Sequence, residues 1–365
     1  MTLDLMVIGC GAVVEGLYRG ALQRLESSGI ARVAALVDPN PARTTALGRH
    51  FKSARAFPTP AEALAAVNPA LTIVTSPPSL HAEHATAAFA AGSHVLCEKP
   101  MAISVDDGES MLAAARAAQR ILAIGMTRRM YPSLAEARAI IAADALGDDV
   151  RFVYREGHVY GWPVSTGAAF RRATAGGGVL VDLGSHVLDF LMALFGEPVI
   201  TACADDGHAD GVETNSRVLL TSARARGTVQ LSWSQPLVNR LHVAGSAGEL
   251  ILDPGRLDVL GWRRRGGSWE TRTGTATWSS DLRRDGPRAT PRNNSECIYY
   301  QLVCALRAVV HDEAVPVDGE QGLRVVRAIE SCYRQAMPLP RPWLTTAEQS
   351  QADARHWSRQ RCLAA

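Results

Sequence analysis

Hydrophobic and polar residues follow two different patterns along this chain, and the change comes near residue 125. Before it, short apolar runs alternate with segments in which apolar residues recur every three or four positions. Such runs are typical of buried strands, and such segments of amphipathic helices. The first run, residues 3–9, leads through a glycine turn into a helix expected over 13–28. Strict alternation of strand and helix predicts a parallel, doubly wound sheet.

After residue 125 this alternation stops. A helix expected over 133–143 leads to a strand over 149–158, and a long apolar helix follows over 179–195. Period-two runs from 199 to about 262 predict an antiparallel sheet. The predicted organisation is an α/β nucleotide-binding domain over 1–125, an α+β domain with a large, mostly antiparallel open sheet over 126–340, and a C-terminal tail over 341–365.

Composition narrows the class of protein. The chain has 365 residues, 47% of them hydrophobic, and a net charge of +2, which is typical of a globular protein and predicts no nucleic-acid partner. No apolar run approaches the roughly 18 residues of a membrane span, and the first residues carry no basic leader. Seven scattered cysteines form no C-x-x-C pair. We therefore expect reduced thiols, no metal site, no membrane partner and a cytoplasmic location.

The glycine turn after the first run carries the first candidate site. Gly9 permits a tight turn, and Gly11 lets the backbone approach a pyrophosphate at the start of the following helix, beside Ala12 and Val13. Val14 stands where a third glycine is usual in this dinucleotide fingerprint. The helix is therefore expected to lie slightly farther from the strand.

Asp38 closes the second strand, where a carboxylate can accept hydrogen bonds from the ribose hydroxyls of a dinucleotide. The same charge repels a 2′-phosphate and favours NAD over NADP, while Arg43 leaves NADP open. The alternative role for Asp38 is a cap for the helix that starts near Pro41.

The loop after the fourth predicted strand should line the same crevice through Ser76, Pro77 and His81. His81 and His84 have the spacing of metal ligands but lack a third ligand at a useful distance in the sequence. A helix start that packs against the sheet is the better interpretation of this pair.

Lys99 stands in the tripeptide Glu98-Lys99-Pro100, directly after an apolar run. Ligands of parallel sheets bind just beyond that edge, so Glu98 and Lys99 are candidates for contact with a cofactor. Of the 38 basic residues only Lys52 and Lys99 are lysines, so position 99 has kept a compact ammonium in a chain that otherwise uses arginine. The alternative is a surface lysine before a proline that ends a strand.

Asp182 and His186 lie four residues apart on the long apolar helix and therefore share one face, which Asp189 extends. Buried ionisable groups are costly unless they are paired or used in chemistry. A paired histidine and aspartate of the core is the structural alternative. The glycine triplet 176–178 before them suggests backbone that closely approaches a ligand.

These segments resemble, in order and spacing, the Gfo/Idh/MocA family of glucose-fructose oxidoreductase, inositol dehydrogenase and rhizopine-catabolism type enzymes. The resemblance runs from residue 1 to about 336 and is carried by G-C-G-A at 9–12, S-P-P-S-L-H-A-E-H-A at 76–85, H-V-L-C-E-K-P-M-A at 94–102 and G-G-G-V-L-V-D-L-G-S-H-V-L-D at 176–189. It implies a Rossmann domain followed by an α+β domain whose open sheet face forms a homodimer or homotetramer.

The resemblance also implies an NAD-dependent dehydrogenase that oxidises a secondary hydroxyl of a sugar, cyclitol or aminosugar derivative. Lys99, Asp182 and His186 match the residues that meet substrate beside the nicotinamide, with either Lys99 or His186 as the proton acceptor and Asp182 orienting His186. The Lys99-Pro100 peptide is expected to be cis. Two other classes stay open, an NAD-using glycoside hydrolase with transient oxidation and a non-catalytic sugar sensor, although the intact set argues against the sensor.

Candidate substrate contacts are aromatic residues that could stack on a sugar and arginines that could hold a diphosphate or carboxylate. They are Arg128, Arg129, Tyr131, His158, Tyr160, Trp162, Phe170 and Arg171. Ordinary surface charge is the alternative for the arginines. An acidic segment with Asp205, Asp206, Asp210 and Glu213 could attract a cationic aminosugar, or form a solvated hairpin. A looser similarity to dehydrogenases of aminoglycoside antibiotic pathways points to the same substrate class.

Overall fold

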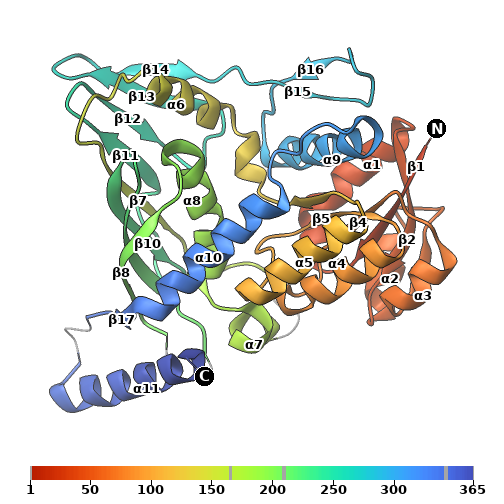
Figure 1. Ribbon diagram of the computed structural model, residues 1–365, viewed down its shortest axis with the longest axis horizontal. Coiled ribbons are helices and arrows are strands. Elements are labelled where there is room, and N and C mark those ends of the chain that lie inside the picture. Colours follow the sequence, from red (N-terminus) through yellow and green to blue (C-terminus); the bar gives the residue numbers. More distant parts are fainter. Residues whose placement is uncertain (1, 164–166, 208–210, 341–343, 365) are drawn as a thin grey trace. The chain divides into compact units, whose positions relative to one another are not determined.

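The computed structural model describes residues 2–163, 167–207, 211–340 and 344–364 (Figure 1). The chain forms two compact units, Met1–Tyr131 with Ala276–Leu323, and Pro132–Thr275 with Arg324–Ala365. This division differs from the expected boundaries at 125 and 340, because the chain returns to the first unit after the large sheet. The returning helix α9, Asn294–His311, packs there against α1, Arg19–Ser27.

The first unit contains the predicted parallel sheet, with strand order β3-β2-β1-β4-β5-β6. The order reverses between β1 and β4, which is the switch point where ligands of such sheets bind. The strands are β1 Leu3–Ile8, β2 Ala31–Val37, β3 Arg55–Phe57, β4 Leu71–Val74, β5 His94–Cys97 and β6 Leu122–Ile124. The helical segments are η1 Val14–Tyr18, α1, α2 Pro41–Gly48, α3 Pro60–Ala66, η2 Pro78–Leu80, α4 His81–Ala90, α5 Val105–Ala117, η3 Thr127–Met130 and α9.

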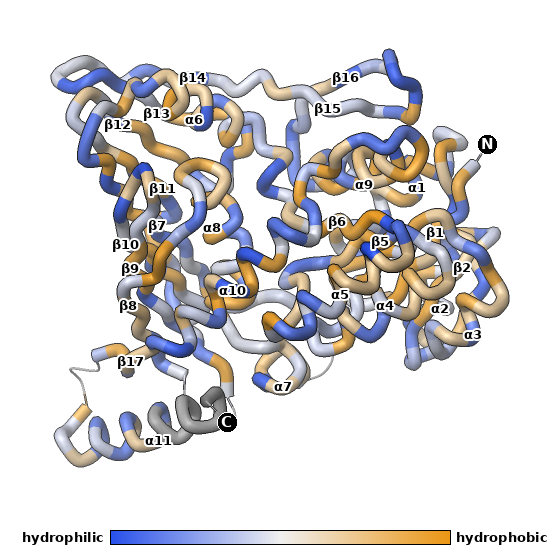
Figure 2. Tube along the Cα trace, viewed as in Figure 1, coloured by the Kyte–Doolittle hydropathy of each residue, from blue (hydrophilic) through white to orange (hydrophobic). Residues whose placement is uncertain are grey.

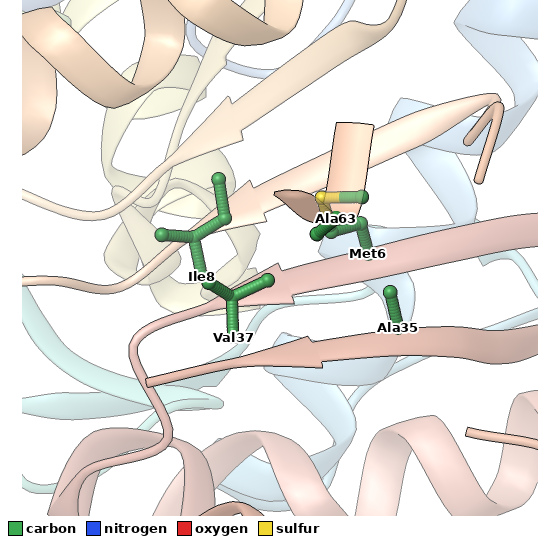
Figure 3. Close-up of a cluster of buried hydrophobic side chains, with 5 residues drawn as sticks. All are labelled: Met6, Ile8, Ala35, Val37 and Ala63. Carbon is green, nitrogen blue, oxygen red and sulfur yellow. The ribbon is translucent and has the colours of Figure 1, made fainter. Parts of the chain in front are cut away.

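Buried side chains of β1 and β2 form a core cluster with Ala63 of α3 (Figure 3). Its members on the strands are Met6, Ile8, Ala35 and Val37. The helices start where side chains cap them. Thr59 accepts a hydrogen bond from the Glu62 nitrogen before α3, and Ser104 accepts one from the Asp107 nitrogen before α5. A small hairpin of β15, Trp278–Ser279, and β16, Arg288–Ala289, also belongs to this unit.

The second unit is built on a nine-stranded sheet with strand order β14-β13-β12-β11-β7-β10-β9-β8-β17. Most neighbours are antiparallel, while β7 with β10 and β8 with β17 are parallel. The strands are β7 Arg151–Gly157, β8 Val199–Asp205, β9 Asn215–Thr221, β10 Arg226–Ser232, β11 Arg240–Ala244, β12 Gly248–Leu252, β13 Val259–Arg264, β14 Glu270–Thr273 and β17 Ala336–Pro338. The predicted fold, a parallel α/β sheet followed by a large and mostly antiparallel sheet, is confirmed.

Helix α8, Val179–Phe195, packs against β9 and β10, and its apolar residues can be followed in Figure 2. The other helical segments assigned wholly or partly to this unit are α6 Pro132–Ala142, η4 Gly167–Phe170, α7 Arg172–Ala175, α10 Gly319–Gln335 and α11 Thr346–Ala364, the last within the expected tail. Contrary to the sequence expectation, residues Arg172–Phe195 are long and apolar enough for a membrane span. However, 78% of the relevant window is buried inside the protein, which is the behaviour of a core helix.

Candidate active site

The glycine turn after β1 lies against the loop after β4. Gly9 has a φ of 93°, and a Cβ at this position would lie 2.6 Å from the Ser76 nitrogen. Glycine is therefore required here by both backbone conformation and space. At Gly11 a Cβ would meet nothing nearer than Arg43 Nη1 at 3.9 Å. This room lets the backbone of Gly11, Ala12 and Val13 approach a phosphate group.

The helix after the turn is not the uninterrupted α-helix expected over 13–28. Ala12 and Val13 are α-helical, the residues from Val14 to Tyr18 form the π-helical segment η1, and α1 continues the helix from Arg19. Val14 and Tyr18 are both completely buried. A π turn holds more residues than an α turn, so the side chains that follow it point in other directions.

Asp38 ties the end of β2 to the glycine turn. Its Oδ2 accepts a hydrogen bond of 2.9 Å from the Cys10 nitrogen, and its Oδ1 accepts one of 2.9 Å from the Asn40 nitrogen. Arg43 Nη1 lies 3.6 Å from Oδ2. The side chain that caps α2 is that of Asn40, which accepts from the Ala42 nitrogen. Each carboxylate oxygen can accept more than one hydrogen bond, so Asp38 keeps capacity for a ribose hydroxyl.

His81 is enclosed, in contrast to the cofactor contact expected for it. Its Nδ1 lies 2.9 Å from the Pro100 carbonyl oxygen and its Nε2 lies 2.8 Å from the Ser76 carbonyl oxygen. The ring therefore connects the loop after β4 to the loop after β5. The Ser76 hydroxyl meets His84 Nδ1 at 2.9 Å, and Pro77 is exposed. No group of three or more possible metal ligands occurs among the residues that the structure describes.

Lys99 follows β5 at the same edge of the sheet, and the Lys99-Pro100 peptide is cis, as predicted. The Glu98 carboxylate stabilises this loop by accepting two hydrogen bonds. Its Oε2 accepts a hydrogen bond of 3.1 Å from the Lys99 nitrogen, and its Oε1 accepts one of 2.5 Å from the Tyr18 hydroxyl. A Cβ at Gly125, the residue directly after β6, would lie 2.8 Å from Glu98 Oε1, so a glycine here leaves room for this carboxylate.

The first unit thus gathers the glycine turn, Ser76 and Lys99 at the carboxyl ends of three adjacent strands. Ile8 of β1 pairs with Val74 of β4, which pairs with Cys97 of β5. The loops that follow these strands contain the glycine turn, Ser76 and Lys99. This is the sheet edge at which a dinucleotide would bind.

The second unit places Asp182 and His186 on one face of α8, where both are half-buried, while Asp189 is buried. Burial, and then the charge of Asp182, raise the pKa of the Tyr160 phenol. An acid and an imidazole thus share one face of α8, and the charge of the acid acts on the phenol of Tyr160. These are groups that can orient a hydroxyl and accept its proton.

The glycines before α8 serve packing within the protein rather than the approach to a ligand that the sequence suggested. A Cβ at Gly177 would overlap the Tyr333 hydroxyl, and one at Gly178 would overlap the Glu213 carbonyl oxygen. Glu213 Oε1 accepts hydrogen bonds from the nitrogens of Gly178 at 2.9 Å and Leu180 at 3.0 Å. Glu213 is therefore the side chain that caps the helix with Asp182 and His186.

An aromatic cluster flanks the Asp182 face, and one member was missed by the sequence analysis. Tyr160 packs edge to face against Trp233 at 4.7 Å and against Phe170 at 5.1 Å, measured between ring centroids. Trp233 follows β10 and could not be found from the sequence, because only the pairing of β10 with β7 brings it beside Tyr160. Trp162 is exposed.

The described residues of the acidic segment, Asp205, Asp206 and Glu213, form neither a solvated hairpin nor an exposed site for a cation. Asp205 and Glu213 are completely buried. Asp206 accepts hydrogen bonds from the backbone nitrogens of Thr214 and Asn215 and from both of their side chains. Asp210 lies outside the described residues.

The remaining predicted substrate contacts divide between the units. In the first, Arg128 is buried on η3, and the Tyr131 hydroxyl donates to Asn294 Oδ1 at 2.9 Å. In the second, Arg171 is exposed just before α7, and so is His158 after β7. Lys99 likewise belongs to the first unit, whereas Asp182 and His186 belong to the second.

Comparison with known proteins assigns both parts of the chain to one family. Residues 3–126 match the oxidoreductase family model with an NAD-binding Rossmann fold, and residues 134–251 match the GFO/IDH/MocA C-terminal domain. The chain belongs to the GFO/IDH/MocA family of oxidoreductases. The resemblance, the enzyme class and the NAD-binding fold predicted from the sequence are thereby confirmed.

Relatives within this family act on sugars and cyclitols. The chain is 31% identical over 205 residues to D-glucoside 3-dehydrogenase of Escherichia coli (strain K12), a match that covers 54% of this chain but only 55% of that protein. It is 27% identical over 281 residues to the scyllo-inositol 2-dehydrogenase (NADP(+)) IolW of Bacillus subtilis (strain 168), covering 73% and 76% of the two chains. The crystal structure of aldose-aldose oxidoreductase from Caulobacter crescentus with glycerol superposes with a TM-score of 0.76 at 26% identity, covering 92% of this chain and 97% of that one.

Proposed function

We propose that this protein is an NAD-dependent dehydrogenase that oxidises a secondary hydroxyl of a sugar, cyclitol or aminosugar derivative. The observation that carries the proposal is the position of Lys99, one of two lysines in the chain, at the carboxyl end of β5. This end lies beside that of β4, whose following loop packs on the glycine turn. A cation is thus held where a reacting group would meet a bound dinucleotide.

The residues of the first unit fit NAD. The room above Gly11 leaves backbone N–H groups available to the pyrophosphate, and Asp38 has acceptor capacity for the adenosine ribose. The negative charge of Asp38 opposes a 2′-phosphate, which favours NAD over NADP. Ser76, Pro77, Glu98 and Lys99 follow the neighbouring strands and would line the nicotinamide side. Bound NAD⁺ supplies an acceptor for the hydride that leaves the carbinol carbon.

The ionisable residues supply the proton chemistry. In our proposal His186 takes the hydroxyl proton as general base, an effect worth typically 10²–10⁴-fold in rate. Lys99 is assigned the stabilisation of negative charge that develops during the reaction. Asp182 orients His186 or binds a neighbouring hydroxyl. The C–H and O–H bonds of the carbinol break, the carbonyl forms, and one hydride and one proton leave in separate directions.

The proposed substrate class rests on aromatic residues of the second unit and on two arginines. Tyr160 and Trp162 present apolar ring surface on which a sugar face can stack, and Arg128 and Arg171 can bind an anionic substituent. The relatives that act on D-glucosides, aldoses and scyllo-inositol favour a polyhydroxylated ring. Within that class we propose an aminosugar-type substrate, as formed in aminoglycoside biosynthesis, as the first candidate for the assay.

The open face of the large sheet favours a homodimer or homotetramer. Val153 of β7 and Leu219 of β9 are large apolar side chains, 41% and 39% exposed. Exposed apolar residues on a sheet commonly mark an interface between subunits. Sedimentation of the purified protein as a monomer at micromolar concentration would refute this part of the proposal.

The deciding experiment is NADH formation from NAD⁺ with a panel of methyl glucosides, scyllo-inositol, nucleotide sugars and aminoglycosides, with NADP⁺ in parallel. We expect substrate-dependent NADH, and a loss of at least about a hundredfold in kcat for Lys99→Ala and His186→Ala with unchanged folding. Near-full turnover by both variants would refute the assigned roles. Cleavage of a glycoside without net NADH formation would identify the protein as the NAD-using hydrolase. Binding of a sugar without any turnover would identify it as the non-catalytic sensor.

A further inference from the structure

Three side chains from distant parts of the sequence meet beneath the Lys99 loop. Gln301 Nε2 of α9 donates to the Tyr18 hydroxyl at 3.4 Å, and that hydroxyl donates to Glu98 Oε1 at 2.5 Å. The other carboxylate oxygen of Glu98 accepts from the Lys99 nitrogen at 3.1 Å. Tyr18 is therefore two hydrogen bonds away from the backbone of Lys99, and all of these groups lie within the first unit.

The hydrogen bond between the Tyr18 hydroxyl and Glu98 is not needed to pack a buried ring at position 18. A phenylalanine would fill the same buried volume without a hydroxyl that must find a partner. The O–H···O⁻ distance of 2.5 Å is that of a short, charge-assisted hydrogen bond. Burial and the charge of Glu98 both raise the pKa of Tyr18, so the phenol stays protonated and donates to the carboxylate.

The π-helical segment within this helix brings Tyr18 to this position. Tyr18 is the last residue of the π segment η1, directly before α1. One extra residue in a turn rotates the side chains that follow by about 100° relative to a regular helix. A regular α-helix from Val14 onward would therefore direct residue 18 elsewhere. Such π segments are frequent at functional sites.

We propose that Tyr18 is a positioning residue for Lys99, acting through the Glu98 carboxylate. The Tyr18 hydroxyl fixes this carboxylate, which in turn holds the Lys99 backbone and keeps a negative charge beside the Lys99 loop. Titratable groups around Glu98 include Tyr18 from η1, Cys97 from β5 and Lys99 itself. The inference rests on the proposed role of Lys99 in the reaction.

The low lysine content of the chain provides a test that needs no substrate. Amine labelling with acetic anhydride, read by mass spectrometry, compares Lys99 with the exposed Lys52 in the same molecule. Loss of the Tyr18 hydroxyl removes a hydrogen bond that fixes the Glu98 carboxylate, which in turn accepts from the Lys99 backbone nitrogen, so the Lys99 loop is held less firmly and its amine is more accessible to the reagent. We expect Tyr18→Phe to raise the labelling of Lys99 relative to Lys52 about threefold at fixed pH, and Glu98→Gln to do the same.

A double-mutant cycle separates positioning from a structural role. The Tyr18→Phe, Glu98→Gln double variant should label no faster than either single variant, since both act through one hydrogen bond. Tyr299→Phe is the matched control, because Tyr299 is also buried in this unit and donates to the Ser280 carbonyl oxygen at 2.7 Å. It should leave the labelling ratio unchanged. If Tyr18→Phe folds poorly, Gln301→Met can replace it in the test. This variant removes the donor to the Tyr18 hydroxyl and should raise the labelling of Lys99 relative to Lys52 by less than about threefold.

Activity provides the second measurement. We expect Tyr18→Phe to lower kcat about tenfold with the NAD⁺ dissociation constant within about twofold of wild type. Equal labelling in Tyr18→Phe and Tyr299→Phe, or effects of Tyr18→Phe and Glu98→Gln that multiply, would overturn the inference. Full turnover by Lys99→Ala would instead refute the proposed function, while the labelling result would still report on the contact itself.

Discussion

Glu213 caps the helix that begins after Gly178, with its Oε1 2.9 Å from the Gly178 nitrogen. The same oxygen accepts from the Leu180 nitrogen at 3.0 Å and from the Tyr333 hydroxyl at 2.8 Å. Three donors thus converge on one buried carboxylate oxygen that comes from a loop 35 residues further along the chain. Glu213 therefore fixes the residue at which α8 begins. The positions of Asp182 and His186 on this helix depend on Glu213, to which we assign no role in the chemistry.

We expect Glu213→Ala to lower the free energy of unfolding by about 3 kcal/mol, because it leaves buried N–H groups without an acceptor. Glu213→Gln retains an acceptor oxygen in the same place and should cost less than about 1 kcal/mol. Urea unfolding followed by tryptophan fluorescence measures both. Equal losses in the two variants would show that the cap is not what stabilises α8.

Glu213 also makes the stability depend on pH. Burial, and then the charge of Asp205, raise the pKa of its carboxyl above the ordinary 4.5. A raised pKa means that the contribution of Glu213 is complete below the unfolded value and is lost as the pH rises through the folded value. Glu213→Gln does not titrate, so its stability relative to wild type should improve between pH 5 and pH 8. A constant difference between the two proteins across this range would contradict the assignment.

Asp38 is expected to set the preference between the two nicotinamide cofactors. Asp38→Asn keeps an oxygen that can accept from the Cys10 nitrogen but removes the charge that repels a 2′-phosphate and pairs with Arg43 at 3.6 Å. The ratio of kcat/KM for NADP⁺ to that for NAD⁺ should rise about tenfold or more. Asp4→Asn, on the exposed pair with Arg32, is the control and should leave the ratio unchanged.

His81 should stabilise the cofactor edge in a pH-dependent way. Burial lowers the pKa of its imidazole below the ordinary 6.5, against the opposing effect of the carbonyl oxygens of Pro100 and Ser76. A lowered pKa gives stability that is complete above 6.5 and is lost as the pH falls through the folded value. His81→Asn should therefore flatten the decline in unfolding free energy between pH 6.5 and pH 5. The exposed His50→Asn is the control, and an equal decline in wild type and His81→Asn would refute the role.

The parallel sheet and the residues at its edge could be predicted from local sequence, because each strand leads directly into its own loop. Gly9, Asp38 and Lys99 each follow a strand, and the strand order alone brings their loops to one edge. The partners of these residues could not be predicted in this way. Tyr18 reaches Glu98 across 80 positions and Tyr333 reaches Glu213 across 120. Such contacts depend on a π turn and on helix packing, which hydrophobic periodicity does not encode.

The glycines before α8 show how a local motif can be misinterpreted without its distant partner. Three successive glycines suggest an approach to a ligand, yet Gly177 faces the Tyr333 hydroxyl and Gly178 faces the Glu213 carbonyl oxygen. Gly178→Ala should therefore destabilise the protein by about 3 kcal/mol, since the backbone at Glu213 must move to make room. Gly161→Ala, where the nearest atom is 3.7 Å from the new Cβ, is the control and should change the stability by less than about 1 kcal/mol. If Gly178→Ala instead kept full stability and weakened only substrate binding, the glycines would serve a ligand, and the cap by Glu213 would not be the reason for their presence.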